Sequence, residues 1–225
     1  MTPTGIIPCA RLSRRAAYAV LLASLAACSS LQPSATPPPA FYSLDSARVG
    51  ATANPQSETT LPAGLPTLLV SPPHAVAGFD GNRMIYLRQD HNLESFAHSQ
   101  WADPPARMLA PLIVAAIGKT GAFRAIVPTP SAAAGELRLD TEIIRLQHEF
   151  LGSPSRVRFT LRAYIVDDKT RLVLARREFD ASVPATSEDP YGGVVAANGA
   201  VRAVLEELAA FCAAASKSQP ETTRR

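Results

Sequence analysis

The chain has 225 residues, of which 47% are apolar and 18% charged, a balance typical of a folded domain and unlike a disordered or collagen-like chain. Its formal net charge of +3 comes from 22 basic and 19 acidic residues. Residues 1–27 contain three arginines and no acid, so the remainder holds 19 basic against 19 acidic residues. This neutral remainder excludes a nucleic-acid-binding protein, which needs a basic surface.

Residues 1–27 have the layout of an export signal. Arg11, Arg14 and Arg15 precede a short apolar stretch, which is too brief to anchor stably across a bilayer. The stretch ends in Leu25, Ala26 and Ala27 followed by Cys28, which resembles the bacterial lipobox, where a cysteine is acylated and the chain is cut before it. An ordinary cleavage site beside a chance cysteine is the alternative, but element order and spacing favour the lipobox. We expect a signal peptide over 1–27 and covalent lipid on Cys28, which attaches a protein to a membrane in effect permanently.

The residue after the lipobox indicates which membrane the lipoprotein is sent to. In Gram-negative lipoproteins a residue other than Asp at this place, here Ser29, indicates transfer to the outer membrane. We therefore expect an outer-membrane lipoprotein on the periplasmic face. Ser13-Arg14-Arg15 resembles a twin-arginine signal, but alanines stand where that signal carries an apolar pair. Of the other cysteines, Cys9 is lost with the signal, and Cys212 lies in an apolar helical pattern that predicts a small buried side chain.

The next segment predicts a tether followed by short strands. Residues 28–40 contain four prolines, which predicts a stiff extended linker. Residues 41–44 and 67–70 predict short strands, and 83–88 a third after a turn at 79–82. The range 46–64 is rich in Ala, Thr, Pro and Gly and predicts a surface loop.

Residues 103–118 predict the first helix. Asp103 is suited to the N-cap, and Pro104 to the first helical position, where its missing N–H has no cost. Apolar residues recur at helical spacing, with Pro111 inside as a source of a kink. Gly118-Lys119-Thr120 matches the end of a Walker A loop, but its first glycine is missing and the segment ends a helix. We expect a helix C-terminus there, and a short strand over 123–127.

Three long strands are expected next. Residues 136–150 change the parity of their apolar positions at Ile143-Ile144, which indicates a bulge or strong twist. Residues 156–166 alternate cleanly between apolar and polar positions. Residues 167–170 predict a hairpin turn, and 171–181 a returning strand.

The remaining elements indicate the fold class. Asp189-Pro190 repeats the cap-then-proline pattern and opens a second helix with an apolar stripe, and 216–225 is a polar tail. We predict an α+β fold, an antiparallel sheet with two main helices packed on one face, with the domain spanning 41–215.

No residue pattern indicates an enzyme or a metal site. The four histidines His74, His91, His98 and His148 lack the spacing of metal ligands, and no serine lies in a nucleophile elbow. Two groups remain as candidates for docking a partner. Arg156, Arg158 and Arg162 share one side of a strand; they bind acidic groups or, as we favour, pair with acids on neighbouring strands. Tyr86 and Trp101 pack in the core or, if exposed, anchor an interface.

The whole pattern is similar to the ABC-type transport auxiliary lipoproteins (PqiC-like). The matching segments, in order along nearly the whole mature chain, are Leu25–Cys28, Phe41–Leu44, Arg83–Tyr86, Phe96-Ala97, Trp101, Met108–Leu112, Arg156–Leu161 and Ala196–Asn198. Each segment is a weak signal alone, and their shared order and spacing carry the resemblance.

The resemblance implies a non-enzymatic periplasmic component with a fold related to the amino-terminal domain of TolB-like proteins. Its partners would be an MCE-type substrate-binding protein and an ABC permease and ATPase that move lipids or other apolar compounds. It implies no cofactor besides the lipid on Cys28, and a homo-oligomer remains open. The alternative function is a periplasmic carrier that holds apolar ligand in its own cavity, between sheet and helices.

Overall fold

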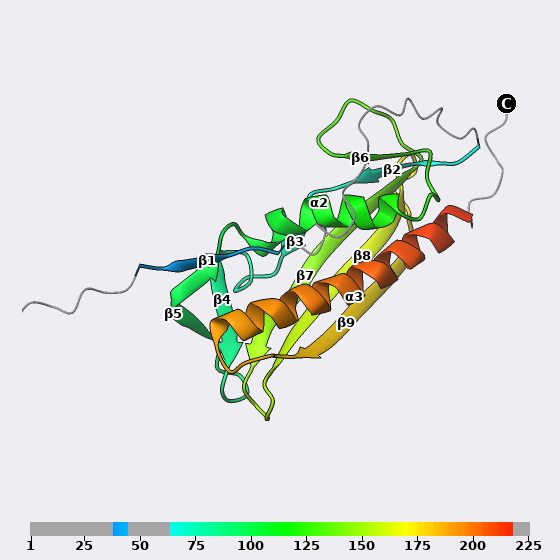
Figure 1. Ribbon diagram of the computed structural model, residues 1–225. Coiled ribbons are helices and arrows are strands. Elements are labelled where there is room, and N and C mark those ends of the chain that lie inside the picture. Colours follow the sequence, from blue (N-terminus) through cyan, green and yellow to red (C-terminus); the bar gives the residue numbers. More distant parts are fainter. Residues whose placement is uncertain (1–37, 45–63, 218–225) are drawn as a thin grey trace, which may run out of the picture. The chain divides into compact units, whose positions relative to one another are not determined.

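Three long strands form the centre of the fold. A computed structural model describes residues 38–44 and 64–217. In it β7 (Leu137–Glu149), β8 (Arg156–Asp167) and β9 (Val173–Pro184) make a continuous antiparallel meander (Figure 1). The expected bulge in the first of these strands is confirmed, since the β7–β8 register shifts between Ile143 and Arg145.

The turn between β8 and β9 is also confirmed. Asp167 Oδ1 accepts hydrogen bonds from the backbone N–H groups of Lys169 (3.0 Å) and Thr170 (2.7 Å). These hydrogen bonds hold the pKa of Asp167 below its usual value. An Asp at the start of a turn stabilises it in this way because its side chain replaces a missing backbone acceptor.

The other edge of β7 carries three short strands one after another. β2 (Thr67–Val70), β3 (His74–Ala75) and β4 (Arg83–Leu87) pair with its beginning, middle and end, all in parallel. One 13-residue strand therefore organises most of the sheet.

Three further strands extend the sheet outward. β6 (Ala125–Pro128) pairs in parallel with β2. β5 (Glu94–Trp101) pairs antiparallel with β4, and β1 (Ala40–Tyr42) pairs in parallel with β5. The sheet is thus mixed, where the sequence predicted antiparallel strands throughout. The reason is that only β4–β5 and β7–β9 are joined by local connections that reverse the strand direction.

Two helices pack on one face of this sheet (Figure 1), which confirms the α+β class. α2 (Pro105–Gly118) and α3 (Pro190–Lys217) contact each other, and α3 also covers β8 and β9. No helix in the described part of the chain is long and apolar enough to cross a membrane.

The helix ends differ from each other in their caps. At α3 the expected cap is present, since Asp189 Oδ1 accepts a hydrogen bond from the Gly192 N–H at 2.7 Å. At α2 the prediction was wrong by one residue: Pro104 is the N-cap, without a side-chain hydrogen bond. Asp103 instead forms an ion pair with Arg107 at 3.2 Å. The second of two successive prolines occupies the first helical position, which shifts the start.

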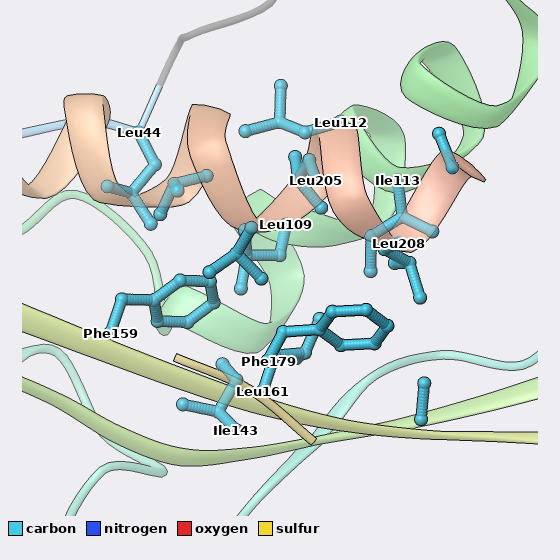
Figure 2. Packing of buried hydrophobic residues seen from close by; sticks show 14 of the residues in the cluster. Leu44, Leu109, Leu112, Ile113, Ile143, Phe159, Leu161, Phe179, Leu205 and Leu208 are labelled. Carbon is cyan, nitrogen blue, oxygen red and sulfur yellow. The ribbon is translucent and has the colours of Figure 1, made fainter. Parts of the chain in front are cut away.

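The core lies between the helices and the inner face of the sheet. Figure 2 shows Phe159, Leu161 and Phe179 from β8 and β9 beneath leucines and isoleucines of both helices. Phe159, Leu161 and Phe179 are at most 1% exposed, so each contributes close to its full hydrophobic stabilisation. Cys212 is fully buried beside them, and burial raises its pKa to about 12. Its thiol is therefore a packing group, as predicted.

Several sequence predictions fall outside the described residues. They are the signal peptide over 1–27 with its lipobox, Cys28 and the tether up to residue 37, most of the loop at 46–64, and the tail from residue 218 onward.

Candidate interaction surfaces

The arginine row lies on the outer face of the sheet, opposite the helices. The central member, Arg162, forms ion pairs with Glu142 on β7 at 3.1 Å and with Glu178 on β9 at 3.0 Å. Opposite charges on adjacent strands stabilise a sheet in this way. The Arg162 guanidinium is thus shared between two carboxylates of its own domain.

The other two arginines of the row are also engaged. Arg158 Nε lies 3.0 Å from a carboxylate oxygen of Asp180. Although burial acts to raise the pKa of Asp180, hydrogen bonds from Arg158 and Thr160 bring it below its usual value. Arg156 donates to the side chain and backbone carbonyl of Ser182 at 2.9 and 2.8 Å. This geometry supports the paired-face interpretation, and a docking role for these arginines stays a prediction.

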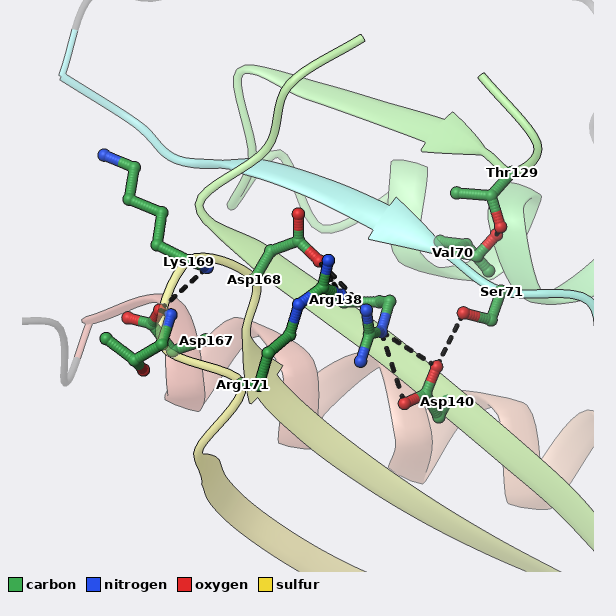
Figure 3. A network of polar contacts seen from close by, with 10 residues as sticks. Val70, Ser71, Thr129, Arg138, Asp140, Asp167, Asp168, Lys169 and Arg171 are labelled. Atoms are coloured by element: carbon green, nitrogen blue, oxygen red, sulfur yellow. Dashed lines mark hydrogen bonds and ion pairs between the residues drawn. The ribbon is translucent and has the colours of Figure 1, made fainter. Parts of the chain in front are cut away.

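The same pairing continues toward the β8–β9 turn, as Figure 3 shows. Arg138 contacts Asp140 at 3.3 Å and Asp168 at 3.1 Å. Asp168 also binds Arg171, and Asp140 accepts a 2.6 Å hydrogen bond from the Ser71 hydroxyl. The charged side chains named here on the outer face therefore compensate each other, consistent with the neutral balance of residues 28–225.

The two candidate aromatic anchors are in different environments. Trp101 is 4% exposed and belongs to the core, as the packing alternative predicted, so it offers no surface for docking. Tyr86 is half-buried, with its ring 4.5 Å from that of Phe96 and its hydroxyl donating to Glu94 at 3.0 Å. Arg88 also pairs with Glu94, and its hydrogen bond lowers the pKa of that carboxyl. Tyr86 thus forms part of a small polar and aromatic cluster.

A groove of about 450 Å³ lies between the two helices. Its lining includes the apolar side chains of Leu112, Leu205 and Ala209 and the charged side chains of Lys119, Arg202 and Glu206. The segment matching part of a Walker loop lies here. It ends α2, as predicted, with Thr120 Oγ1 donating to the Ile117 carbonyl at 2.7 Å.

A buried serine–histidine pair is the feature that the sequence patterns missed. Ser155 Oγ and His148 Nε2 lie 2.8 Å apart, and Glu188 accepts a hydrogen bond from the Ser155 N–H at 2.9 Å. The spacing is that of a nucleophile and base, but the serine is 0% and the histidine 4% exposed. The adjacent cavity of about 20 Å³ has room for a single water. The pair is therefore closed to a substrate and links β7, the β7–β8 loop and the start of α3.

Metal-binding clusters of three or more His, Cys, Asp or Glu are absent from the part of the chain that the structure describes. The buried Nδ1 of His148 has no hydrogen-bond partner among the described residues and lies against Gly193.

Comparison with known proteins identifies the family. The sequence profile for the "ABC-type transport auxiliary lipoprotein component" matches residues 42–209. The chain belongs to this family. The match covers most of the chain and includes strands β2 to β9, α2 and most of α3. A transport auxiliary lipoprotein is a membrane-attached component of a transport system and not a class of enzyme.

Solved structures agree on the fold of this auxiliary lipoprotein. Protein XCC0632 from Xanthomonas campestris superposes with a TM-score of 0.64 at 22% identity, over 71% of this chain and 90% of that one. An uncharacterized protein superposes with a TM-score of 0.55 at 15% identity, over 79% of this chain and 97% of that one. No curated protein matches the sequence.

Proposed function

We propose that the protein is the outer-membrane-anchored, periplasmic docking component of an MCE-type ABC transporter for lipids or other apolar compounds. The family match over residues 42–209 is the observation that carries the proposal. The lipobox at residues 25–28 supplies the lipid anchor, and the serine after it directs the lipoprotein to the outer membrane. Acyl chains on Cys28 hold the chain in the membrane, and the proline-rich segment sets its reach into the periplasm.

The described surfaces suit a docking protein. The outer face of the sheet is charged but internally neutralised, so contacts there give specificity more than affinity. The groove between α2 and α3 is apolar and open, which suits the burial of an apolar segment. In this arrangement the lipoprotein receives the MCE end of the transporter at the outer membrane, and the permease and ATPase remain distant partners.

Co-purification tests the proposal. The tagged full-length lipoprotein is crosslinked in cells, solubilised in detergent and captured, and the captured proteins are identified by mass spectrometry. We expect an MCE protein, with the permease and ATPase at lower yield. Cys28→Ala, which removes the anchor, should lose the MCE partner. Capture of the intact lipoprotein with no MCE protein would overturn the proposal.

A periplasmic carrier is the second candidate, and the helix groove is the observation that favours it. The cavity between sheet and helices, where a carried ligand was expected, holds only about 20 Å³. The groove of about 450 Å³ is within the size range of small-molecule sites. Native mass spectrometry of the protein with lipid extract distinguishes a carrier from a docking component. Bound lipid that is lost in Ala209→Trp supports the carrier. A protein that never carries lipid argues against it.

A further inference from the structure

Strand β9 forms an uncovered edge of the sheet. It has 12 residues and, within the described ranges, pairs only with β8. One row of its backbone N–H and C=O groups therefore points away from the sheet without a partner strand. Long free edges of this kind are templates for pairing with another chain.

One end of this edge is also apolar. Leu172, Val173 and Leu174 are 64%, 58% and 50% exposed, and they are consecutive. A patch of three exposed aliphatic side chains beside free backbone groups indicates a contact surface.

One pair of opposite charges along β9 is placed so that it can match a second copy of the strand. In an antiparallel pair of two identical strands centred on residue 178, residues whose numbers sum to 356 are opposite each other. Arg176 then lies opposite Asp180 of the second strand, and by symmetry the same pair occurs twice. Ala175 lies opposite Ala181, and Arg177 opposite Phe179, whose ring Arg177 already contacts within one chain at 4.9 Å.

We propose that β9 pairs antiparallel with β9 of a second copy, with the two-fold axis at Glu178. The pairing joins the two sheets into one, and the symmetry places both helix layers on the same face. It also brings the exposed Leu172–Leu174 segment of each copy beside Ser182–Pro184 of the other. The partner is a second copy because this register sets Arg176 of each copy opposite Asp180 of the other.

The single unfavourable contact of this register is tolerated. Glu178 faces Glu178 of the second copy, and like charges directly opposite destabilise a sheet. Each Glu178, however, is held at 3.0 Å by its own Arg162, which it shares with Glu142 and which offsets part of its negative charge. Asp180 is positioned by Arg158, and Arg176 by the ring of Tyr164 at 5.8 Å, so the attractive pairs need little reordering.

Charged edges also serve to prevent pairing. Arg177, which lies on the helix side of the sheet and pairs with Glu207 at 3.0 Å, is a residue of the kind that protects an edge. The two interpretations make different predictions. A protective edge has no fixed partner strand, whereas the proposed pairing places residue 178 of one copy opposite residue 178 of the other.

Site-specific crosslinking of the full-length lipoprotein in its membrane tests the proposal. In Glu178→Cys the two cysteines are opposite each other, with Cβ atoms about 5 Å apart, so a short bis-maleimide should give a covalent dimer. In the control Ser182→Cys, on the same strand and side, the two cysteines are separated by about eight residues, or roughly 27 Å, and should give none. Dimers from Ser182→Cys, monomers from both variants, or crosslinks of Glu178→Cys only to another protein would each overturn the proposal.

Two charge variants test the register by affinity. Glu178→Gln removes the like-charge contact and should lower the dissociation constant of the dimer, measured by sedimentation of the full chain in detergent. Arg176→Glu puts an acidic side chain opposite Asp180 at both symmetry-related positions. It should therefore raise that dissociation constant by about tenfold. Equal constants for both variants and the wild type would contradict the proposed pairing.

Discussion

Gly193 in α3 packs directly against the imidazole of His148. A Cβ at this position would lie 2.6 Å from His148 Nδ1, closer than real contacts allow. Because both the helix backbone and the buried ring are fixed, neither moves easily. We predict that Gly193→Ala lowers the free energy of unfolding by about 1–3 kcal/mol, the usual cost of overpacking, measured by urea denaturation.

Gly199, further along the same helix, is the matched control. A Cβ there meets Val183 at 3.4 Å, an ordinary contact, and alanine favours the helix over glycine by up to about 1 kcal/mol. Gly199→Ala should therefore leave stability unchanged or raise it. Equal losses in both variants would show that helix composition, and not the histidine contact, governs the effect.

The buried His148 should make the stability of the folded domain depend on pH. Burial lowers its pKa below the ordinary 6.5, although the charges of Glu188 and Asp189 act to raise it. Because the folded state favours the neutral ring, the unfolded chain binds the proton more readily, and stability is complete above pH 6.5. It should fall as the pH drops below 6.5 toward the folded pKa, by at most about 1.4 kcal/mol per pH unit.

Urea unfolding between pH 7.5 and pH 5 measures this dependence. His148→Gln should flatten the slope in this range, whereas the exposed His98→Gln should keep it. The carboxylates of Glu188 and Asp189 have lowered pKa values, through hydrogen bonds from Ser155 and from Gly192 respectively. Their contribution is lost at more acidic pH, below their unfolded values, so it lies outside the range. An unchanged slope in His148→Gln would contradict the assignment.

At the scale of elements, the two helix starts make a natural comparison. The Asp189 carboxylate caps α3 at 2.7 Å, whereas Asp103 makes no cap hydrogen bond at α2. Losing a true N-cap destabilises a helix. We predict that Asp189→Ala lowers Tm by about 2–4 °C and that Asp103→Ala changes it much less, measured by circular dichroism. A larger drop for Asp103→Ala would contradict the capping assignment.

The sequence predicted those elements whose signals are local. The bulge near Ile143, the turn at Asp167 and the cap at Asp189 each depend on neighbouring residues, and each was found within a few positions. Strand β5 was missed because Glu94–Trp101 mixes exposed polar and half-buried residues without alternation. The parallel pairing of β2, β3 and β4 with β7 was missed for a different reason: it joins segments far apart in the chain, which periodicity does not report.

The candidate surfaces were predictable to a similar degree. Alternation along β8 placed the arginines on one face, but their partners Glu142, Glu178 and Asp180 depend on strand register. The groove depends on how two helices meet, and the Ser155–His148 pair on a loop that closes against a strand. None of these has a signature within a short stretch of sequence.

At the scale of the whole molecule, the charges of the domain are compensated within it. The net charge of +3 belongs to residues 1–27, and ion pairs cover the outer face of the sheet. Within the described residues, arginines of the outer face such as Arg138, Arg158 and Arg162 are engaged by carboxylates of the same domain, which weakens their attraction for acidic headgroups. We propose that the lipobox at residues 25–28, which lies outside the described residues, supplies the membrane attachment.

Cys28→Ala tests this directly. The variant should accumulate as an uncut precursor that incorporates no labelled palmitate, because the thiol that receives the lipid is gone. Once the signal is removed by other means, the domain should leave the membrane fraction at ordinary ionic strength, since acyl chains supply the binding energy at about 0.8 kcal/mol per buried CH₂. Cys212→Ala is the control, because that thiol is buried in the core. This variant should still incorporate palmitate and should stay in the membrane fraction. Palmitate labelling that persists in Cys28→Ala would show that another residue carries the anchor.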